Sequence, residues 1–379
     1  MPPGRSTSRR KQAPAALPTM ADVAARAGVS AMTVSRALKD PEQVTDETRR
    51  RVTAAVRETG YVPNGLAGVL KSAGHSKLVA AIFPSLQNSL FAHTIQGLAD
   101  TLQASGLHLM VADSRRSREV EESLVESLLA HRPSAIVLHE TVHTPKARRM
   151  LARAGIPVVE IGDLSPQPID SLVSFSNRDA AAAMTNHLLE CGYRRIGFAS
   201  LALAGNVRAR HRREGFELAL RQAGITPAPH LMLEAPAGFD SGAAALAQLT
   251  SAEPKLQAIF FAGDVLATGA LLECQQRGWA VPRRLAIASF DDYDIHDRLK
   301  PRLTVVQVPR YEIGSRAAGL IIEAIARGGG HTSQMLDLGF RIAAHDSTRP
   351  ASGVRVARSL AAATGAATPP AAASARPRS

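Results

Sequence analysis

Residues 20–38, MADVAARAGVSAMTVSRAL, hold two short apolar-faced segments that a single glycine separates. In the first segment the apolar side chains recur every three or four residues, which places one stripe along an α-helix: Met20, Val23, Ala24 and Ala27. Thr19 followed by Asp22 predicts a capping box where this helix begins. Gly28 suits the left-handed conformation in which a chain leaves a helix, and Ser30 suits the cap of the next helix. The start of the chain is therefore constrained to a compact helical unit.

The second segment divides into two faces. Its inner face carries Val34, Ala37 and Leu38, and its outer face carries Met32, Ser35, Arg36 and Lys39. A third helix is predicted between the cap Thr45 and Gly60, with an inner face of Val52, Ala55, Val56 and Thr59 and with Arg49, Arg50 and Arg51 facing outward. The pattern predicts a helix-turn-helix whose second helix presents a thin, mostly uncharged edge to DNA. A small helical bundle with a solvated charged surface fits the same pattern, so a second observation is needed.

The charge distribution supplies this second observation. Residues 1–77 carry 13 Lys and Arg against 6 Asp and Glu, whereas residues 78–348 carry 27 of each kind. Residues 349–379 carry 5 arginines and no acid. Positive charge is thus concentrated in the helical head and in the C-terminal tail, and a basic head on a neutral body favours phosphate binding by the head.

Length and composition limit the remaining possibilities. A chain of 379 residues exceeds one ordinary domain. It has no apolar run of the length of a membrane span and no signal peptide, so we expect a cytoplasmic protein without a membrane partner. Cys191 and Cys274 show no metal or redox spacing and are expected to be buried free thiols. The Ala-, Pro-, Ser- and Arg-rich tails, residues 1–17 and 349–379, are predicted to be disordered.

The middle of the chain reads as repeated strand–helix units. Short apolar segments such as KLVAAIF, SAIVLH, LQAIFFA and RLAIASF alternate with longer helical stretches. Strands that are apolar along their length are typical of parallel sheets buried on both faces, and two such sheets in series predict a two-lobed α/β body with a cleft. Ligands bind at the carboxyl ends of such strands, which here read His139, Gly263-Asp264 and Asp291-Asp292. There is no GxGxxG, phosphate-loop, GxSxG or HExxH motif, so no cofactor, metal site or catalytic residue is predicted.

These features together resemble the lactose-repressor (LacI) family of bacterial transcription regulators over residues 18–348. The stretches that carry the resemblance include DVAARAGVSAMTVSRAL, VTDETRRRVTAAVRETGYVPN, FFAGDVLATGAL and ASFDDYD. The resemblance implies a small all-α helix-turn-helix head over 18–60, a hinge helix over 61–77, and a periplasmic-binding-protein-like body over 78–348 that binds an effector and dimerises. It also implies binding to double-stranded operator DNA as a homodimer. The tail has no leucine heptads, so a tetramer held by a coiled coil is not expected.

The resemblance assigns DNA contacts to the second helix and to the hinge. Ala31 and Met32 match base-reading positions, Arg36 matches a major-groove reader of guanine, and Thr33 and Ser35 suit phosphates. A phosphate contact or a solvated surface position remains the alternative for Arg36. Leu70 matches a leucine that wedges into the minor groove, although a plain flexible linker is the alternative. The full predicted set is Ser30, Ala31, Met32, Thr33, Ser35, Arg36, Asn64 and Leu70.

In the cleft the resemblance assigns effector contacts to Phe91, Asp179, Arg212, Phe239 and Asp291, and the strand ends add His139 and Asp264. Three alternatives stay open. Asp291 capping a turn is one, and Phe91 belonging to the core is another. The third is Arg212 pairing with Glu214 or Glu217 on a helix surface. Many sugar-binding members carry Asn-Asp where this chain has Gly263-Asp264, which puts one hydroxyl contact in doubt.

A closer resemblance to the gluconate and ketogluconate repressors rests on MTVSRALKDPEQV, LHETVHTPKARRML, GIPVVEI and MLDLGF. It implies a sugar-acid effector, because the paired N–H donors of an arginine such as Arg212 match the two oxygens of a carboxylate. Arg310 is a second candidate contact. A neutral sugar is the alternative effector. A sugar carrier is disfavoured by the basic head, and an enzyme is disfavoured by the missing catalytic motifs.

Overall fold

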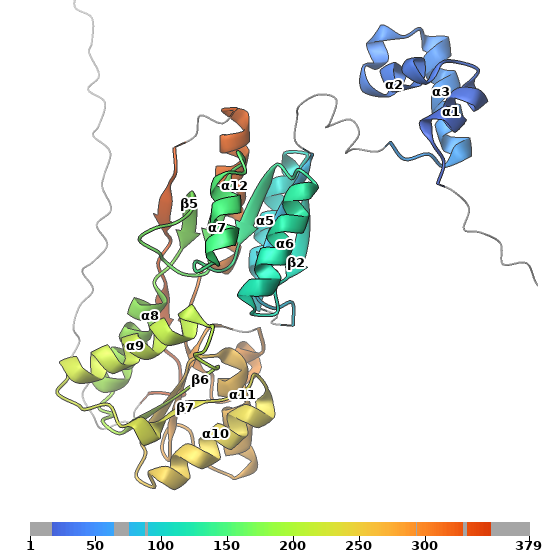
Figure 1. Ribbon diagram of the computed structural model, residues 1–379. Helices are drawn as coiled ribbons and strands as arrows, with labels where there is room; N and C mark the ends of the chain where they lie inside the picture. Colours follow the sequence, from blue (N-terminus) through green and yellow to red (C-terminus); the bar gives the residue numbers. More distant parts are fainter. Residues whose placement is uncertain (1–16, 64–75, 88–89, 293, 329–331, 350–379) are drawn as a thin grey trace, which may run out of the picture. The chain divides into compact units, whose positions relative to one another are not determined.

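The computed structural model describes residues 17–63, 76–87, 90–292, 294–328 and 332–349 (Figure 1). The chain separates into two compact units, Met1–Ser76 and Lys77–Ser379. We call the first unit the head and the second the body, and describe each by itself.

The head consists of three helices, α1 (Met20–Ala27), α2 (Ala31–Lys39) and α3 (Asp46–Thr59), with a 3-10 turn η1 (Pro41–Gln43) before α3. The capping box predicted at Thr19 is present, since the Thr19 hydroxyl and the Asp22 carboxylate accept each other's backbone N–H. Gly28 ends α1 with φ +64° and Gly60 ends α3 with φ +66°, as expected for left-handed caps. Local capping signals therefore set the start of all three helices and the ends of α1 and α3.

The head packs around small and β-branched side chains. Its buried core consists of Val23, Ala24, Ala27, Val34, Ala37, Val52, Ala55 and Tyr61. Arg51 is exposed, as predicted, but its guanidinium also contacts the head. Its Nη2 donates to the backbone oxygens of Ala27 at 2.6 Å and Gly28 at 3.1 Å, because the last carbonyls of α1 have no partner within their own helix. Arg51 thus ties α3 to the end of α1.

The body has two lobes, each built on a six-stranded sheet. The lobe 1 sheet has the order β11 (Met335–Asp337), β5 (Ser171–Ser174), β4 (Val158–Ile161), β3 (Ala135–Leu138), β1 (Leu78–Phe83), β2 (His108–Asp113). The lobe 2 sheet has the order β12 (Arg341–Ala343), β10 (Thr304–Gln307), β9 (Ala286–Phe290), β8 (Ala258–Phe261), β6 (Ile196–Ser200), β7 (Met232–Glu234). Parallel pairing was predicted and is confirmed except at β12, which runs antiparallel to β10 because it follows β11 after a short crossing.

Helices cover both sheets. Those of lobe 1 are α5 (Leu90–Ala104), α6 (Arg118–Ala130), α7 (Pro145–Ala152) and α12 (Arg310–Ala326). Those of lobe 2 are α8 (Asn177–Glu190), α9 (Val207–Gln222), α10 (Phe239–Ala252) and α11 (Asp264–Gln276), with 3-10 turns η2 (Pro229–Leu231) and η3 (Asp294–Arg298). The central strands β3, β8 and β9 are buried at every residue, which explains their unbroken apolar sequence. Within the described residues no helix is long and apolar enough to cross a membrane.

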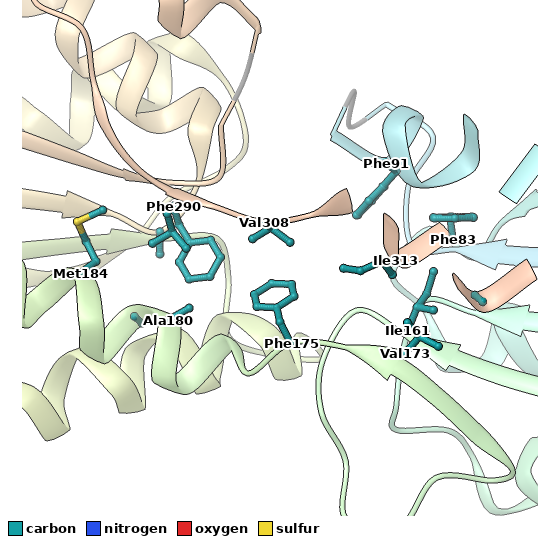
Figure 2. Close-up of a cluster of buried hydrophobic side chains, with 14 of the residues drawn as sticks. Phe83, Phe91, Ile161, Val173, Phe175, Ala180, Met184, Phe290, Val308 and Ile313 are labelled. Carbon is teal, nitrogen blue, oxygen red and sulfur yellow. The ribbon is translucent and has the colours of Figure 1, made fainter. Parts of the chain in front are cut away.

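The chain crosses between the lobes at residues 175–176, 308–309 and 338–340. The lobes are therefore not strictly successive in sequence, because α12 and β11 return to lobe 1. Figure 2 shows Phe175 and Val308 between the lobes, with Phe175 facing Phe290 at a ring-centroid distance of 6.3 Å. One buried apolar cluster thus runs through the crossings, and any rotation of one lobe against the other has to bend these three segments.

Candidate DNA-reading face and interlobe cleft

The outer face of α2 is exposed and lightly charged. Ser30 caps the helix, since its hydroxyl oxygen accepts the backbone N–H of Thr33 at 3.1 Å. Ala31, Met32 and Arg36 are exposed, and the Met32 side chain is 71% exposed although it is apolar. We call these three residues the reading face. Thr33 and Ser35 are half-buried beside it.

The cations of the head fall into two groups. Arg26 pairs with Glu58 and Arg49 pairs with Asp46, so their charges are already matched. Arg36 makes no ion pair with any other residue that the structure describes, which leaves its guanidinium free to bind an external anion or a base edge. The predicted contacts Asn64 and Leu70 lie outside the described residues.

A small cavity of about 50 Å³ lies between the two lobes. Lobe 1 contributes Phe91, Arg116 and Arg310, and lobe 2 contributes Arg208, Arg212, Asp264 and Asp291. A large cavity of about 440 Å³ adjoins it and shares Arg116, Leu201 and Asn206 with it. The large cavity has an apolar wall of Leu201, Ala202, Ala204, Ala235, Pro236 and Ala237. The cleft therefore combines a charged end with a wider apolar space.

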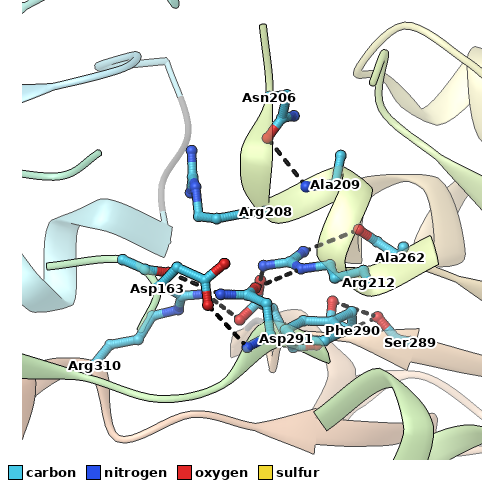
Figure 3. Close-up of polar contacts among 12 residues, drawn as sticks. Asp163, Asn206, Arg208, Ala209, Arg212, Ala262, Ser289, Phe290, Asp291 and Arg310 are labelled. Atoms are coloured by element: carbon cyan, nitrogen blue, oxygen red, sulfur yellow. Dashed lines mark hydrogen bonds and ion pairs between the residues drawn. The ribbon is translucent and has the colours of Figure 1, made fainter. Parts of the chain in front are cut away.

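Asp291 is the centre of the charged end (Figure 3). Arg310 donates to one carboxylate oxygen, and Arg212 Nη2 lies 3.6 Å from the other. Burial by itself raises the pKa of Asp291, but Arg310 and Arg212 outweigh it and hold that pKa below its usual range. Asp291 also has φ +74°, an uncommon conformation for a residue other than glycine. The alternative that Asp291 only caps a turn does not account for its two arginine partners.

Arg212 is held by protein groups on several sides. Its Nε donates to Asn177 Oδ1 at 2.8 Å, and its Nη1 donates to the backbone oxygen of Ala262 at 3.0 Å. Its guanidinium carbon lies 3.6 Å from the centroid of the Phe290 ring. Burial lowers the pKa of Arg212 to about 10, which leaves it charged at neutral pH.

The alternative that Arg212 pairs on the helix surface is wrong. The carboxylate of Glu217 is instead bound by Arg213 at 2.9 Å and by Arg221 at 2.7 Å. Arg212 lies one residue before Arg213 on α9 and is therefore rotated toward the cleft.

Two ion pairs and one histidine–carboxylate hydrogen bond join the lobes across the cleft. Arg310 of lobe 1 meets Asp291 of lobe 2, and Arg208 on α9 meets Glu140 at 2.9 Å. His211, also on α9, meets Asp163 at 2.7 Å, and this hydrogen bond raises the pKa of His211. The lobe arrangement of this structure is therefore stabilised by paired charges that a ligand has to rearrange or join.

Asp264 and His139 each carry a buried polar atom without a hydrogen-bond partner in the described structure, Asp264 Oδ2 and His139 Nδ1. Burial and the nearby Asp291 raise the pKa of Asp264 to about 6. Asp264 lines the small cavity, so its free oxygen can accept a ligand hydroxyl. His139 is not among the residues that line either cavity. Its ring packs against Phe91 at 4.5 Å between centroids, and burial holds its pKa well below the usual value.

The structure separates the other predicted contacts. Phe91 satisfies both alternatives, because it is buried in the core and also lines the small cavity. Asp179 is exposed and lines neither cavity, because it lies two residues, or about 200° of helix rotation, beyond the buried Asn177. Phe239 lies at the start of α10, is 46% exposed, and lines neither cavity. The structure thus does not bring Asp179 and Phe239 to the cleft end that holds Arg212.

Sequence reasoning missed four cleft residues: Arg116, Asn177, Asn206 and Arg208. Asn206 carries a signal that could have been used, since an asparagine after a glycine predicts a helix cap, and its Oδ1 does accept the N–H of Ala209 at 3.2 Å. Arg116 and Arg208 lie among other arginines in sequence, and only the fold distinguishes them.

Comparison with known proteins identifies the family to which the chain belongs. Residues 19–64 match the model described as "Bacterial regulatory proteins, lacI family", and residues 185–348 match a periplasmic binding protein-like domain. The HTH-type transcriptional regulator GntR of Escherichia coli (strain K12) is 37% identical over 325 residues, which cover 86% of this chain and 97% of that protein. The chain belongs to the LacI family.

Further relatives of this LacI-family chain agree. GntR of Pseudomonas aeruginosa is 38% identical over 332 residues, covering 87% of this chain and 96% of that protein. A crystal structure of a LacI-family transcriptional regulator from Silicibacter pomeroyi superposes with a TM-score of 0.82 at 34% identity, covering 87% of this chain and 99% of the other. The protein is thus a DNA-binding transcriptional regulator rather than an enzyme, as its sequence predicted.

Proposed function

We propose that this LacI-family regulator is a repressor whose operator affinity is controlled by a small sugar acid of the gluconate type, bound between the lobes of the body. The observation that carries the proposal is the charge of the cleft. Four arginines line the small cavity, Arg116, Arg208, Arg212 and Arg310, against two carboxylates, Asp264 and Asp291, and Glu140 of the large cavity pairs with Arg208. Glu234, which also lines the large cavity, is exposed and accepts the backbone N–H of Leu203. The small cavity therefore keeps one positive charge to be matched.

A monocarboxylate supplies that match. An unpaired charge in a partly dry cleft is costly, so a ligand that brings one negative charge gains over a neutral ligand of the same size. The sequence resemblance to gluconate and ketogluconate repressors supports the same class of ligand. The free oxygen of Asp264 adds an acceptor for a hydroxyl farther along the sugar chain.

The sizes of the cavities support a ligand that spans both of them. The small cavity has the volume of one or two water molecules, whereas the large cavity falls within the range of ordinary ligand pockets. A six-carbon acid would therefore place its chain in the large cavity and direct polar groups toward the arginines. Binding would join groups from both lobes, and a ligand that favours one lobe arrangement shifts the equilibrium toward it.

For the head we propose that the reading face enters the major groove, with Arg36 bound to a guanine, and that two chains bind DNA as a homodimer. Leu70 is proposed as the minor-groove wedge. Replacement of Leu70 by Ala should reduce DNA bending while leaving effector affinity unchanged. A bending assay with an unchanged angle would favour a plain linker.

The experiment that tests the effector class is calorimetric titration of the full chain with gluconate, 2-ketogluconate and glucose. We expect the two acids to bind at least about tenfold more tightly than glucose, since charge-assisted contacts of this kind contribute more than 1.4 kcal/mol. Equal affinity for the acids and for glucose would reject the sugar acid and favour a neutral-sugar effector. The family assignment would be unaffected by that result.

A further inference from the structure

Arg116 occupies a distinctive place in the cleft. It lies in the connection between β2 and α6, and it lines both the small and the large cavity. Among the residues that the structure describes, it is the one cation shared by the two cavities; the other three arginines line only the small one. A ligand that spans both cavities therefore passes Arg116.

Arg116 also differs from its neighbours in its partners. Arg212 and Arg310 share Asp291, and Arg208 binds Glu140. No hydrogen bond or ion pair joins the Arg116 side chain to another residue in the described part of the chain. The Arg116 side chain keeps solvent contact, and partial burial and the charge of Arg208 lower its pKa, while the attraction of Glu140 and Asp113 offsets this only in part.

The backbone holds Arg116 in place. Its φ is +58° and that of Arg115 is +52°, two consecutive left-handed residues that are not glycine. The turn is closed by Asp113 Oδ1, which accepts the N–H of Arg115 at 2.7 Å, and by the N–H of Ser117, which donates to the oxygen of Ser114 at 2.9 Å. Left-handed residues persist where the surroundings fix them, so the position of Arg116 is built into the turn.

Across the cleft, Arg208 presents a second unsatisfied donor. Its Nε is buried and has no hydrogen-bond partner among the described residues, although its Nη2 is bound to Glu140. Arg208 is 8% exposed and lies in the first turn of α9, where the positive end of the helix dipole adds to its charge. Arg116 of lobe 1 and Arg208 of lobe 2 thus line the same small cavity with donors to spare.

We propose that Arg116 is the acid-selecting residue of this regulator, and that it binds the effector carboxylate together with Arg208 across the cleft. Arg212 is then a positioning residue, because Asn177, Ala262 and Asp291 already engage it. The carboxylate joins the lobes, so the group that distinguishes an acid from a neutral sugar also stabilises the closed arrangement. This inference rests on the proposed sugar-acid function and assigns its selectivity to one side chain.

The test replaces Arg116 in the full chain and measures affinity for gluconate and for glucose by calorimetry. Arg116→Gln removes the charge, and Arg116→Lys keeps the charge without the planar fork. Arg115→Gln is the matched control, since Arg115 is exposed, shares the left-handed backbone, and lines neither cavity. A thermal unfolding scan of each variant establishes that it is folded.

We expect Arg116→Gln to weaken gluconate binding by about 10- to 100-fold while glucose affinity changes by less than about threefold. Arg116→Lys should fall between wild type and Arg116→Gln, and Arg115→Gln should match wild type. The same Arg116→Gln protein should lose the gluconate response of its complex with a DNA duplex selected in vitro, and should retain its affinity for that duplex.

Two results would overturn the assignment. If Arg116→Gln keeps the wild-type preference for acid over sugar, the carboxylate is bound elsewhere and only this inference fails. If the variant weakens gluconate and glucose equally, Arg116 shapes the cleft and does not select acids. A wild-type protein without acid preference would reject the proposed effector class itself, which the wild-type titration shows before any variant is made.

Discussion

The reading face of the head and the charged end of the cleft use arginine in opposite ways. Arg36 is exposed and has no ion pair with another described residue, whereas Arg212 is buried and held by an amide, a carbonyl and a carboxylate. An exposed cation stays hydrated at little cost, but a buried cation has to be matched by protein groups before any ligand arrives. In the head, Arg36 can therefore bind DNA without breaking a contact within the protein. In the cleft, an effector has to bind among arginines and carboxylates that already contact one another.

This difference predicts where substitutions act. Loss of a side chain from the reading face should change DNA recognition and leave folding intact. Loss of a side chain from the cleft network should change folding first, because the groups left behind are buried charges.

The largest effect is expected at Asp291. Asp291→Ala leaves Arg212 and Arg310 facing each other without their shared carboxylate, so the free energy of unfolding of the body should fall by about 3–5 kcal/mol. Urea unfolding followed by circular dichroism measures this. Asp292→Ala is the control, since the Asp292 side chain is 31% exposed, accepts a hydrogen bond from the neutral amide of Gln307, and lies 3.8 Å from His296, whose pKa burial lowers to about 4. If both variants lose the same unfolding free energy, the buried ion pairs of Asp291 contribute no more to stability than an ordinary polar contact does.

His143 extends the same rule to a buried cluster of lobe 1 that lies away from the arginines. Burial lowers its pKa, but hydrogen bonds to Glu121 and Glu160 outweigh burial and raise the pKa to about 9. Because the pKa is raised on folding, the stabilisation is fully present below the ordinary pKa of 6.5 and is lost as the pH rises through 9.

Between pH 6 and pH 10 this contribution should fall by about 3 kcal/mol. Urea unfolding across that range measures it, and His143→Gln should flatten the alkaline part of the profile. The raised pKa of Asp264 also lowers stability as pH rises, but between about 4 and 6, so the two groups are separable. A variant with the wild-type slope would show that His143 is not the titrating group.

On the reading face, Arg36→Ala should cost about 1–3 kcal/mol of discrimination at one operator base pair and should leave unfolding unchanged. Binding curves for single-base variants of a selected operator measure the discrimination. The control is Arg57→Ala, which removes an exposed cation of α3 outside the reading face. If Arg36→Ala weakens specific and random DNA equally, Arg36 contacts phosphate, as the alternative from the sequence holds.

The smallest effect tests how much the hydrogen bonds of Arg51 to the end of α1 stabilise the head. Gly28→Ala and Gly60→Ala carry the same left-handed penalty, because their φ values are +64° and +66°. An added Cβ at Gly28 would lie 2.6 Å from Arg51 Nη2, whereas at Gly60 no atom lies within 4 Å. Gly28→Ala should therefore destabilise the head by about 1 kcal/mol more than Gly60→Ala, the value of one hydrogen bond. Hydrogen exchange of head peptides in the full chain measures the difference, and equal protection would make Arg51 unimportant to the head.

The two regions also differ in how far sequence predicts them. Caps and helix periodicity are local, so Thr19, Gly28 and the two faces of α2 could be predicted from neighbouring residues, and the apolar strands predicted both sheets. The cleft partners are not local. Asn177 reaches Arg212 from 35 residues away, and Glu140 reaches Arg208 from 68 residues away.

Asp179 shows the limit of matching by resemblance. Asn177 of the same helix α8 contacts Arg212, but the helix phase turns Asn177 inward and Asp179 outward. Arg116 shows the limit of composition, since Arg115 and Arg116 share the left-handed turn before α6 and only Arg116 lines the two cavities. Which side chains of a helix or turn reach the cleft depends on packing between distant segments, and a single sequence does not reveal that packing.

The central claim is that a negative charge in the cleft controls binding of DNA by the head. The most direct measurement is the fluorescence anisotropy of a labelled, in vitro selected operator, titrated with the full chain in the presence of gluconate or of glucitol, its uncharged counterpart of equal chain length. The account predicts that gluconate changes operator affinity by about 5- to 150-fold and that glucitol changes it by less than about twofold. Equal effects of the two compounds, or no effect of gluconate at saturation, would contradict it.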